Sequence, residues 1–446
     1  MRRIVAAIAA LLLAQPVVAQ VVGNTPIASA GGPPFRYALP TVGATSVMGD
    51  SILLQHTDGN QRQFNAGNIA TWAGALTFGR FAWTGNYAVA GTRSDEWAGQ
   101  IAAAVADGSR VVIVGTGVND VSAGRTGAQV LATMTGYVDQ LVAAGKLPVV
   151  IGMIGAAGFS AAQVAERDVY NRGMAAYLVT RGVFVDAASA VLVDARPGVV
   201  PVWKPDHNNV DGSGNPDGVH PSTIGSWAIG QLIAAKTEWR NLAPMNRLPT
   251  SNSASATQIL ANGLFGTQTG GTAYGSGVSS AAGSTAPAGW SVARSGSTGQ
   301  VVDVVSFGAA PGPGSKIVHS IAFAAPSSTA RVTQTYNLLA AGLTAGTAYK
   351  AVARLHVPAG QRLKGVSLMM QWTVGGSTTV VYDMYSLLSA TGNWPTGDVD
   401  IPLETPALTF PAGTATLAEM SIRVYPVVGE TNSVTVEVSQ VGVNKQ

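Results

Sequence analysis

Cysteine is absent from this chain of 446 residues, and charged side chains are scarce. Without a thiol the protein can form no disulfide bond and no thiolate metal site. Charged residues make up 11% of the chain, whereas an average soluble domain has about a quarter. The formal net charge is +3, and no cluster of Lys and Arg with interleaved aromatic residues occurs. These features exclude a nucleic-acid-binding protein of the usual basic kind.

A membrane-spanning apolar run is missing from the N-terminus. The apolar stretch from Ile4 to Leu13 is about half of the roughly 20 residues that a spanning helix needs. It follows the charged Met1-Arg2-Arg3 and precedes the small residues Val17-Val18-Ala19. This pattern predicts a secretory signal peptide at residues 1–19, cleaved before Gln20. The alanine-rich signal favours a bacterial source.

Motifs for metals and cofactors are missing as well. The chain contains no His-Glu-x-x-His, no carboxylate cluster with ligand spacing, and no glycine-rich phosphate loop carrying the required lysine. We therefore expect neither a metal ion nor an organic cofactor.

Two short segments together supply the parts of a serine nucleophile. Gly49-Asp50-Ser51 stands between the apolar residues Val47-Met48 and Ile52-Leu53-Leu54, a pattern that predicts a buried strand ending in a strand-to-helix turn. Asp217-Gly218-Val219-His220 places an acid three residues before a histidine. A serine needs a general base, and the base needs an orienting group. Ser51, His220 and Asp217 are the candidates; taken singly, Ser51 could instead be a helix N-cap and Asp217 part of a turn.

Two other histidines compete for the role of the base. His56 lies in the turn His56-Thr57-Asp58-Gly59-Asn60, and His207 lies in the loop Trp203 to Asn209. Neither stands directly before a helix as His220 does. We interpret His207 as a surface or substrate-contact residue at the rim of the site.

The ordered segments resemble the SGNH (GDSL-type) hydrolase and esterase superfamily over residues 45–240. Gly49-Asp50-Ser51 is similar to its first block, Gly117-Val118-Asn119-Asp120 to its G-x-N-D block, and Asp217-x-x-His220 to its last block. Gly91 is the best match to the single glycine of the second block. The resemblance covers about half of the chain.

That resemblance implies a mechanism. Ser51 attacks an ester carbonyl, His220 transfers the proton, and Asp217 orients the imidazole. The oxyanion hole would consist of the backbone N–H groups of Ser51 and Gly91 and the side-chain amide of Asn119. Asp50 and Asp120 would hold the loops around the site.

Apolar strands alternate with helical segments in residues 45–245. We expect strands at 46–49, 111–115, 148–154 and 183–186, and helices at 94–106, 128–144, 161–180 and 223–240. This alternation predicts a three-layer α/β/α domain with a parallel sheet, whose catalytic loops follow the carboxyl ends of the strands.

The composition changes near residue 245. Residues 20–44 are expected to be an extended N-terminal segment and residues 246–256 a flexible linker rich in Ser, Thr and Asn. Residues 257–446 alternate apolar and polar side chains, as in Ser433 to Val438, which predicts an all-β sandwich.

The start of this second part resembles jelly-roll carbohydrate-binding modules. The resemblance rests on Asn262-Gly263-Leu264-Phe265 and the later Pro287-Ala288-Gly289-Trp290. Trp290 is expected in the core of the sandwich. Trp372 and Trp394 are candidates for stacking on a sugar ring, and each could equally be a core residue.

Three functions remain open from the sequence. The first is a secreted esterase that removes O-acetyl groups from a carbohydrate. The second is a secreted esterase or lipase for lipid or small acyl esters, with a purely structural β-sandwich. The third is a glycan-binding surface or phage-associated protein with a vestigial hydrolase domain, which an intact triad would oppose.

Overall fold

The computed structural model describes residues 43–54, 63–210, 215–236, 242, 248–280, 283–296, 299–385 and 393–446. These residues all belong to one compact unit, residues 37–446. The expected signal peptide, the segment 20–42 and His56 lie outside the described residues. Residues 43–236 are called the α/β domain below, and residues 248–446 the β-domain.

A parallel sheet of five strands forms the centre of the α/β domain. Its strands, in spatial order, are β3 (Ala82–Asn86), β1 (Ala44–Gly49), β4 (Val111–Gly115), β5 (Leu147–Ile151) and β6 (Val183–Val185). Every residue of β4 and β5 is buried, as expected for strands covered on both faces.

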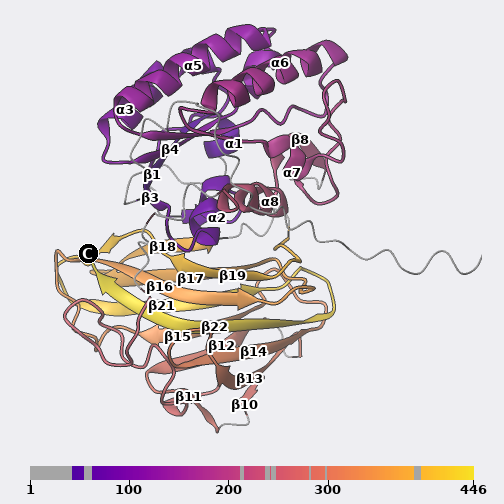
Figure 1. The fold of residues 1–446 in the computed structure, drawn as a ribbon. Helices are drawn as coiled ribbons and strands as arrows, with labels where there is room; N and C mark the ends of the chain where they lie inside the picture. The colour runs from indigo at the N-terminus through magenta and orange to yellow at the C-terminus, as the bar shows by residue number, and fades with distance from the viewer. Residues whose placement is uncertain are drawn as a thin grey trace, which may run out of the picture. The chain divides into compact units, whose positions relative to one another are not determined.

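Helices cover both faces of this sheet. They are α1 (Ser51–Leu54), α2 (Ile69–Leu76), α3 (Ala98–Ala106), α4 (Val118–Ser122), α5 (Gly127–Ala143), α6 (Ala161–Leu178), α7 (Ala187–Val191) and α8 (Thr223–Ala234), with a 3₁₀ turn at Ser94–Glu96. Helices α3, α5 and α6 lie on one side, and α2 and α8 on the other (Figure 1). The predicted α/β/α fold class is therefore confirmed. In the described part of the chain, no helix combines the length and apolarity needed to cross a membrane.

Side-chain caps explain where two of the long helices begin. Thr126 accepts a hydrogen bond from the backbone N–H of Gln129, and Ser160 does the same for Gln163. Each glutamine side chain accepts the backbone N–H of its cap in return, which completes a capping box. Helix α6 thus begins directly after Ser160, as the sequence predicts.

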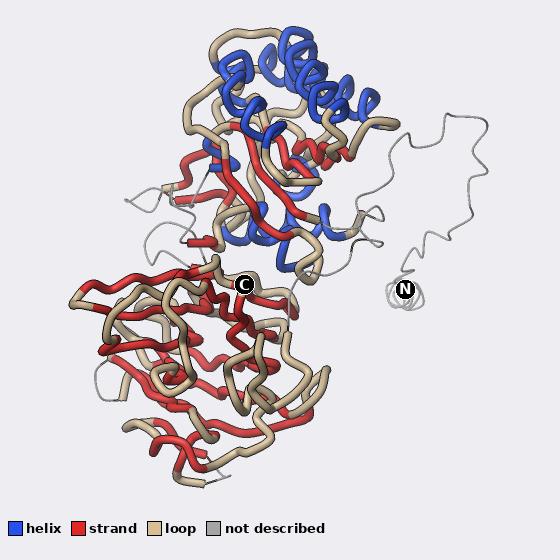
Figure 2. Tube along the Cα trace, turned by 90° about the vertical axis from the view of Figure 1, so that its left-hand side faces the viewer, coloured by secondary structure: helices blue, strands red, loops and turns tan. Residues whose placement is uncertain are grey.

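Beyond residue 248 the described chain contains strands but no helix, a contrast that Figure 2 shows in red and blue. One sheet contains β10 (Val278–Ser280), β13 (Val301–Ala309), β14 (Ser315–Phe323), β22 (Asn432–Lys445), β16 (Ala348–Val357), β19 (Val399–Glu404) and β20 (Leu408–Thr409). The other contains β12 (Trp290–Ser295), β15 (Arg331–Asn337), β21 (Ala415–Tyr425), β17 (Gly365–Val374), β18 (Ser377–Tyr385) and β2 (Gln63–Asn65). A separate hairpin pairs β9 (Gly270–Ala273) with β11 (Thr285–Pro287).

The two large sheets share one apolar core, which is the arrangement of a β-sandwich. Strand β22 illustrates the predicted alternation, because Val434, Val436 and Val438 are buried whereas Ser433, Thr435 and Glu437 between them are not.

The buried tryptophans of the β-domain correct one prediction. Trp290 is in the core, as expected. Trp372 is 1% exposed and Trp394 is 0% exposed, so a sugar ring cannot reach either indole face. Trp372 instead packs edge-on against Tyr349 and Phe410, within the sandwich. The predicted sugar-stacking role of Trp372 and Trp394 is therefore wrong.

The expected flexible linker is also attached to the β-domain where it is described. The side-chain oxygen of Asn252 accepts the backbone N–H of Leu264 at 2.7 Å, and its carbonyl accepts the N–H of Asn262 at 2.8 Å. The carbonyl of Pro249 accepts a hydrogen bond from Gln440 at 3.3 Å. Residues 248–256 thus lie against the sandwich as part of it.

One strand of the sandwich comes from the α/β part of the sequence. Strand β2 pairs in parallel with β18, with Phe64 opposite Asp383. Helix α2 follows β2 and divides its side chains between two cores. Ala70 and Ala73 belong to the α/β core, whereas Trp72 and Ala75 belong to the sandwich core. The two domains are therefore joined by a shared helix and a shared sheet.

Candidate active site

Ser51 follows directly from the carboxyl end of β1, next to the end of β4. Gly49 has a φ of 149°, and a Cβ at this position would lie 1.8 Å from the carbonyl oxygen of Gly115. A glycine is therefore required for both its conformation and its lack of a side chain. This close approach lets the chain turn into α1, whose first residue is Ser51.

Asp50 connects the serine turn to the loop after β4. Its carboxylate accepts the backbone N–H of Ile52 at 3.0 Å and that of Gly117 at 3.3 Å, and the hydroxyl of Thr116 at 3.1 Å. Complete burial raises the pKa of Asp50, although these hydrogen bonds act in the opposite direction. Asp50 thus holds two loops of the site together.

The structure brings Ser51, His220 and Asp217 into one line of hydrogen bonds. The Oγ of Ser51 lies 2.8 Å from Nε2 of His220, and Nδ1 of His220 lies 3.0 Å from Oδ2 of Asp217. Both partners come from the hairpin of β7 (Asn208–Val210) and β8 (Pro216–Pro221). The serine is thus within direct proton-transfer distance of a histidine that is itself held by a carboxylate.

The carboxylate of Asp217 is stabilised in its charged form. Burial by itself would raise the pKa of Asp217, but hydrogen bonds from the His220 ring and from the backbone N–H groups of His220 and Val219 outweigh it. The pKa of Asp217 is lowered to about 2 as a result. Asp217 is therefore ionised across the neutral range, as an orienting group for His220 must be.

Asn208 supports this pair and was not predicted from the sequence. Its amide nitrogen lies 3.2 Å from Oδ1 of Asp217 and donates to the carbonyl of His220 at 2.8 Å. Its side-chain oxygen accepts the backbone N–H of Gly218 at 2.7 Å. Asn208 is 8% exposed, so these bonds are shielded from water. A polar residue on the strand that pairs with Asp-x-x-His is the signal that could have identified it.

Gly91 lies in the loop after β3, and Asn119 lies in helix α4. The Nδ2 of Asn119 donates to the carbonyl of Thr92 at 3.0 Å, which ties α4 to the residue after Gly91. Gly91 is exposed and has a φ of 75°, a left-handed conformation that favours glycine. A Cβ at Gly91 would meet nothing within 4 Å, so conformation and not space accounts for this glycine.

Asp120, in α4, is bonded to the segment that follows Gly91. It is fully buried and accepts the backbone N–H of Ser94 at 2.9 Å and the hydroxyl of Ser94 at 2.7 Å. Arg125 forms an ion pair with the same carboxylate. Asp120 thus joins the residues after Gly91 to the helix that carries Asn119.

The other candidate residue of the α/β domain, His207, directly precedes β7, at the end of the hairpin where Asn208 pairs with Pro221. Its Nδ1 bonds the carbonyl of Pro205 at 2.8 Å, and its own carbonyl accepts the backbone N–H of Ser222 at 2.8 Å. His207 is half-buried and immediately precedes Asn208. A contact of His207 with substrate stays a prediction.

Ser51, His220 and Asp217 are partly exposed. The side chains of His220 and Asp217 are 26% and 22% exposed, and Ser51 is half-buried. The triad therefore lies near the surface of the α/β domain.

Comparison with known proteins finds a family model that matches this part of the chain. Residues 47–228 match the model of the GDSL-like lipase/acylhydrolase family. No curated protein matches the chain.

Several solved structures are similar to this part of the chain. A GDSL-like lipase from Bacteroides thetaiotaomicron is 16% identical, with a TM-score of 0.32, over 44% of this chain and 89% of that one. An acetyl-xylooligosaccharide esterase from Geobacillus is 14% identical, with a TM-score of 0.35, over 44% and 97%. An esterase from Pseudoalteromonas is 10% identical, with a TM-score of 0.30, over 43% and 94%. The match to the GDSL-like lipase/acylhydrolase family model, over residues 47–228, covers less than half of the chain.

Proposed function

We propose that the protein is a secreted serine esterase that removes O-acetyl groups from a carbohydrate. The observation that carries the proposal is the line of hydrogen bonds from Ser51 through His220 to Asp217, at 2.8 Å and 3.0 Å. The secretory pattern at residues 1–19 supports export.

The chemistry follows from these distances. His220 removes the proton of Ser51 as Oγ attacks the carbonyl carbon of the ester, and a tetrahedral oxyanion forms. Collapse of this species expels the alcohol, which takes the proton from His220. A water molecule, activated by the same imidazole, then cleaves the acyl-enzyme and releases the acid. Asp217 stabilises the imidazolium at each stage.

The oxyanion needs donors that are already in place. The backbone N–H groups of Ser51 and Gly91 and the amide of Asn119 are our assignment. The amide of Asn119 has two N–H groups, and one of them bonds Thr92, which fixes the orientation of the other. Removal of one such donor typically lowers the rate by about 10²–10³-fold.

The partial exposure of the triad supports an ester substrate whose alcohol part is large, such as a sugar. Because His220 and Asp217 keep about a quarter of their side-chain surface exposed, the sugar of an acetylated polysaccharide can remain outside while its small acyl group reaches Ser51.

A second candidate, an esterase for small acyl or lipid esters with a structural β-sandwich, is favoured by a different observation. Trp372 and Trp394, which we considered for sugar stacking, are buried. Strand β2 and helix α2 of the α/β domain also contribute a strand and core side chains to the sandwich. Under this candidate the β-domain binds no glycan.

The test combines two assays on the full-length protein. Acetate release from acetylated polysaccharides is measured beside hydrolysis of p-nitrophenyl esters of increasing chain length. We expect acetate release and a preference for the acetyl ester. Efficient hydrolysis of longer esters without acetate release from any polysaccharide would favour the second candidate.

Variants of the triad test the mechanism itself. Ser51→Ala and His220→Ala should each lower kcat by about 10³-fold or more, and the double variant should be hardly worse, because the residues act as a unit. A folded Ser51→Ala protein with the turnover of the wild type would refute the triad.

A further inference from the structure

Side chains from other parts of the chain hold the helix that carries the nucleophile. Helix α1 begins at Ser51 and is described as far as Leu54. The carbonyl of Leu53 accepts hydrogen bonds from two side-chain amides, those of Asn68 at 2.9 Å and Asn86 at 3.4 Å. Leu53 is two residues from Ser51, so these amides hold the segment that carries the nucleophile.

Asn68 has two separate bonds that lock its side chain. Its Oδ1 accepts the backbone N–H of Ala70 at 2.8 Å, which caps the N-terminus of α2, while its Nδ2 donates to Leu53. The residue is fully buried. The position of α2 therefore fixes the position of the amide that holds α1.

The β-domain in turn fixes α2. Asn65, at the end of β2, pairs opposite Tyr385 of β18, and the carbonyl of Asn65 accepts the backbone N–H of Asn68 at 3.0 Å. The indole of Trp72 on α2 packs against that of Trp394, with ring centroids 5.2 Å apart and both side chains 0% exposed.

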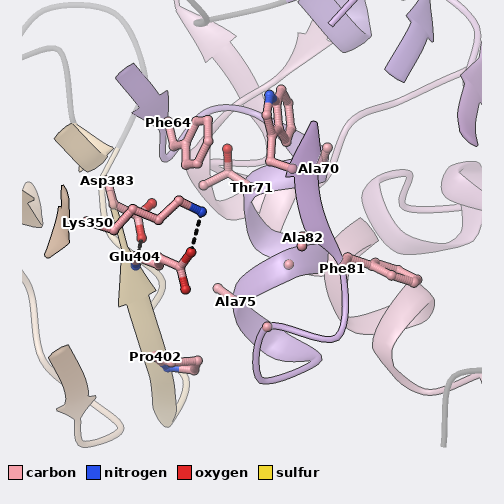
Figure 3. A pocket seen from close by; sticks show the side chains of 13 residues that line it. Phe64, Ala70, Thr71, Ala75, Phe81, Ala82, Lys350, Asp383, Pro402 and Glu404 are labelled. Atoms are coloured by element: carbon pink, nitrogen blue, oxygen red, sulfur yellow. Dashed lines mark hydrogen bonds and ion pairs between the residues drawn. The ribbon is translucent and has the colours of Figure 1, made fainter. Parts of the chain in front are cut away.

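A cavity lies at the other face of the junction, between α2 and the sandwich. Its volume is about 70 Å³, and Thr71 and Ala75 of α2 and Glu404 of β19 line it (Figure 3). Lys350 bonds Glu404 at 2.6 Å. The backbone N–H of Glu404 bonds the carboxyl of Asp383, directly opposite Phe64 of β2. Helix α2 thus faces β19 across this cavity, while β2 is paired with β18 at Asp383.

We propose that Asn68 is a positioning residue for Ser51 and that the β-domain holds it in place through β2 and α2. Through β18 and Trp394, the β-domain then supports the position of Ser51 and is not only an appendage for binding. The proposal rests on the proposed function of Ser51 as the nucleophile.

The first variant separates the two bonds of Asn68. Asn68→Asp keeps the oxygen that caps α2 and removes the donor to Leu53. We expect kcat for p-nitrophenyl acetate to fall about 10–100-fold with KM nearly unchanged, because a small misplacement of a catalytic group costs that much. The rate at which a fluorophosphonate modifies Ser51 should fall in parallel.

The matched control is Asn262→Asp in the β-domain. Asn262 is 8% exposed, accepts the backbone N–H of Thr267 at 3.0 Å and donates to the carbonyl of the same residue at 2.8 Å. The control thus loses the same kind of bond far from α2 along the chain. It should lower Tm without changing kcat.

A second pair of variants tests the role of the β-domain. Trp394→Leu removes the contact with Trp72, whereas Trp290→Leu removes an equally buried tryptophan that packs on Phe265 and Tyr336. At a temperature at which both proteins are fully folded, Trp394→Leu should lower kcat and the fluorophosphonate rate several-fold, and Trp290→Leu should leave both unchanged.

Two results would overturn the proposal. One is a folded Asn68→Asp protein with the kcat of the wild type, and the other is equal kcat for the two tryptophan variants. If Asn68→Asp does not fold, the tryptophan pair alone decides. Failure of the proposed function has a different signature, since wild-type protein and Ser51→Ala would then have the same activity.

Discussion

Asp383 at the junction of the two domains makes stability depend on pH in an unusual direction. Its side chain is buried, and burial raises the pKa of Asp383 to about 7, although the backbone N–H groups of Glu404 and Met384 favour the charged form. The negative charge of Glu404 raises this pKa further, and Lys350 lowers it. In the unfolded chain the carboxyl ionises near its ordinary value of 3.8.

The sign follows from proton binding. Between pH 3.8 and about 7 the folded protein binds more protons at Asp383 than the unfolded chain does, so the stability from this group falls as the pH rises. At about 1.4 kcal/mol for each pH unit, the loss between pH 4 and pH 8 is about 4 kcal/mol. Asp383→Asn stays neutral throughout and should not show this loss.

Urea unfolding of the wild type and Asp383→Asn at pH 4 to 8 measures the effect. The difference in the free energy of unfolding between the two proteins should change by about 4 kcal/mol in favour of the variant as the pH rises. Other titrating groups, such as Asp217, cancel in this difference. Parallel pH profiles for the two proteins would refute the assignment of a neutral, buried Asp383.

Three further predictions concern the site and the domains. Asn119→Ala should lower kcat by about 10²–10³-fold and change KM little, because its amide bonds a charge present only in the transition state; an effect on KM alone would make Asn119 a substrate-binding residue. Asn208→Leu should lower kcat at least about tenfold in a folded protein, since Asp217 and His220 lose their common donor, and unchanged steady-state kinetics would contradict this role. A chain truncated after residue 245 should aggregate or unfold well below the Tm of the full chain, because Trp72 loses its cover; a stable, fully active fragment on gel filtration would contradict the shared core.

Much of the α/β domain could be predicted from the sequence because its signals are local. The apolar run from Val111 to Gly115 predicted a buried strand, and Ser160 predicted the start of a helix. The structure has β4 and the N-terminus of α6 at these positions. The sequence also predicted that Ser51, His220 and Asp217 lie together. The prediction rested on the order of three motifs, each at the end of a strand or in the loop beside it: Gly49-Asp50-Ser51, Gly117-Val118-Asn119-Asp120 and Asp217-x-x-His220.

The rest depends on contacts between distant segments. Strand β2 has three residues, and nothing in Gln63-Phe64-Asn65 indicates that its partner is β18. The sequence left open whether Trp372 is buried, because the face of β17 that meets the other sheet is set only when the two sheets pack together. Asn208 acquires its role only when β7 and β8 pair.

The shared helix α2 also constrains the order in which the chain can mature. The face of α2 that carries Trp72 is made early in synthesis, but the residues that cover it, such as Trp394, and the strand that pairs with β2 are made near the end. Until then this apolar face has no partner, and the emerging chain exposes a surface prone to aggregation. Under the proposed secretion, the chain gains from crossing a membrane unfolded and folding only after its last strands have arrived. Under our proposal for Asn68, the turn that carries Ser51 is held in place only once the C-terminal half has been made.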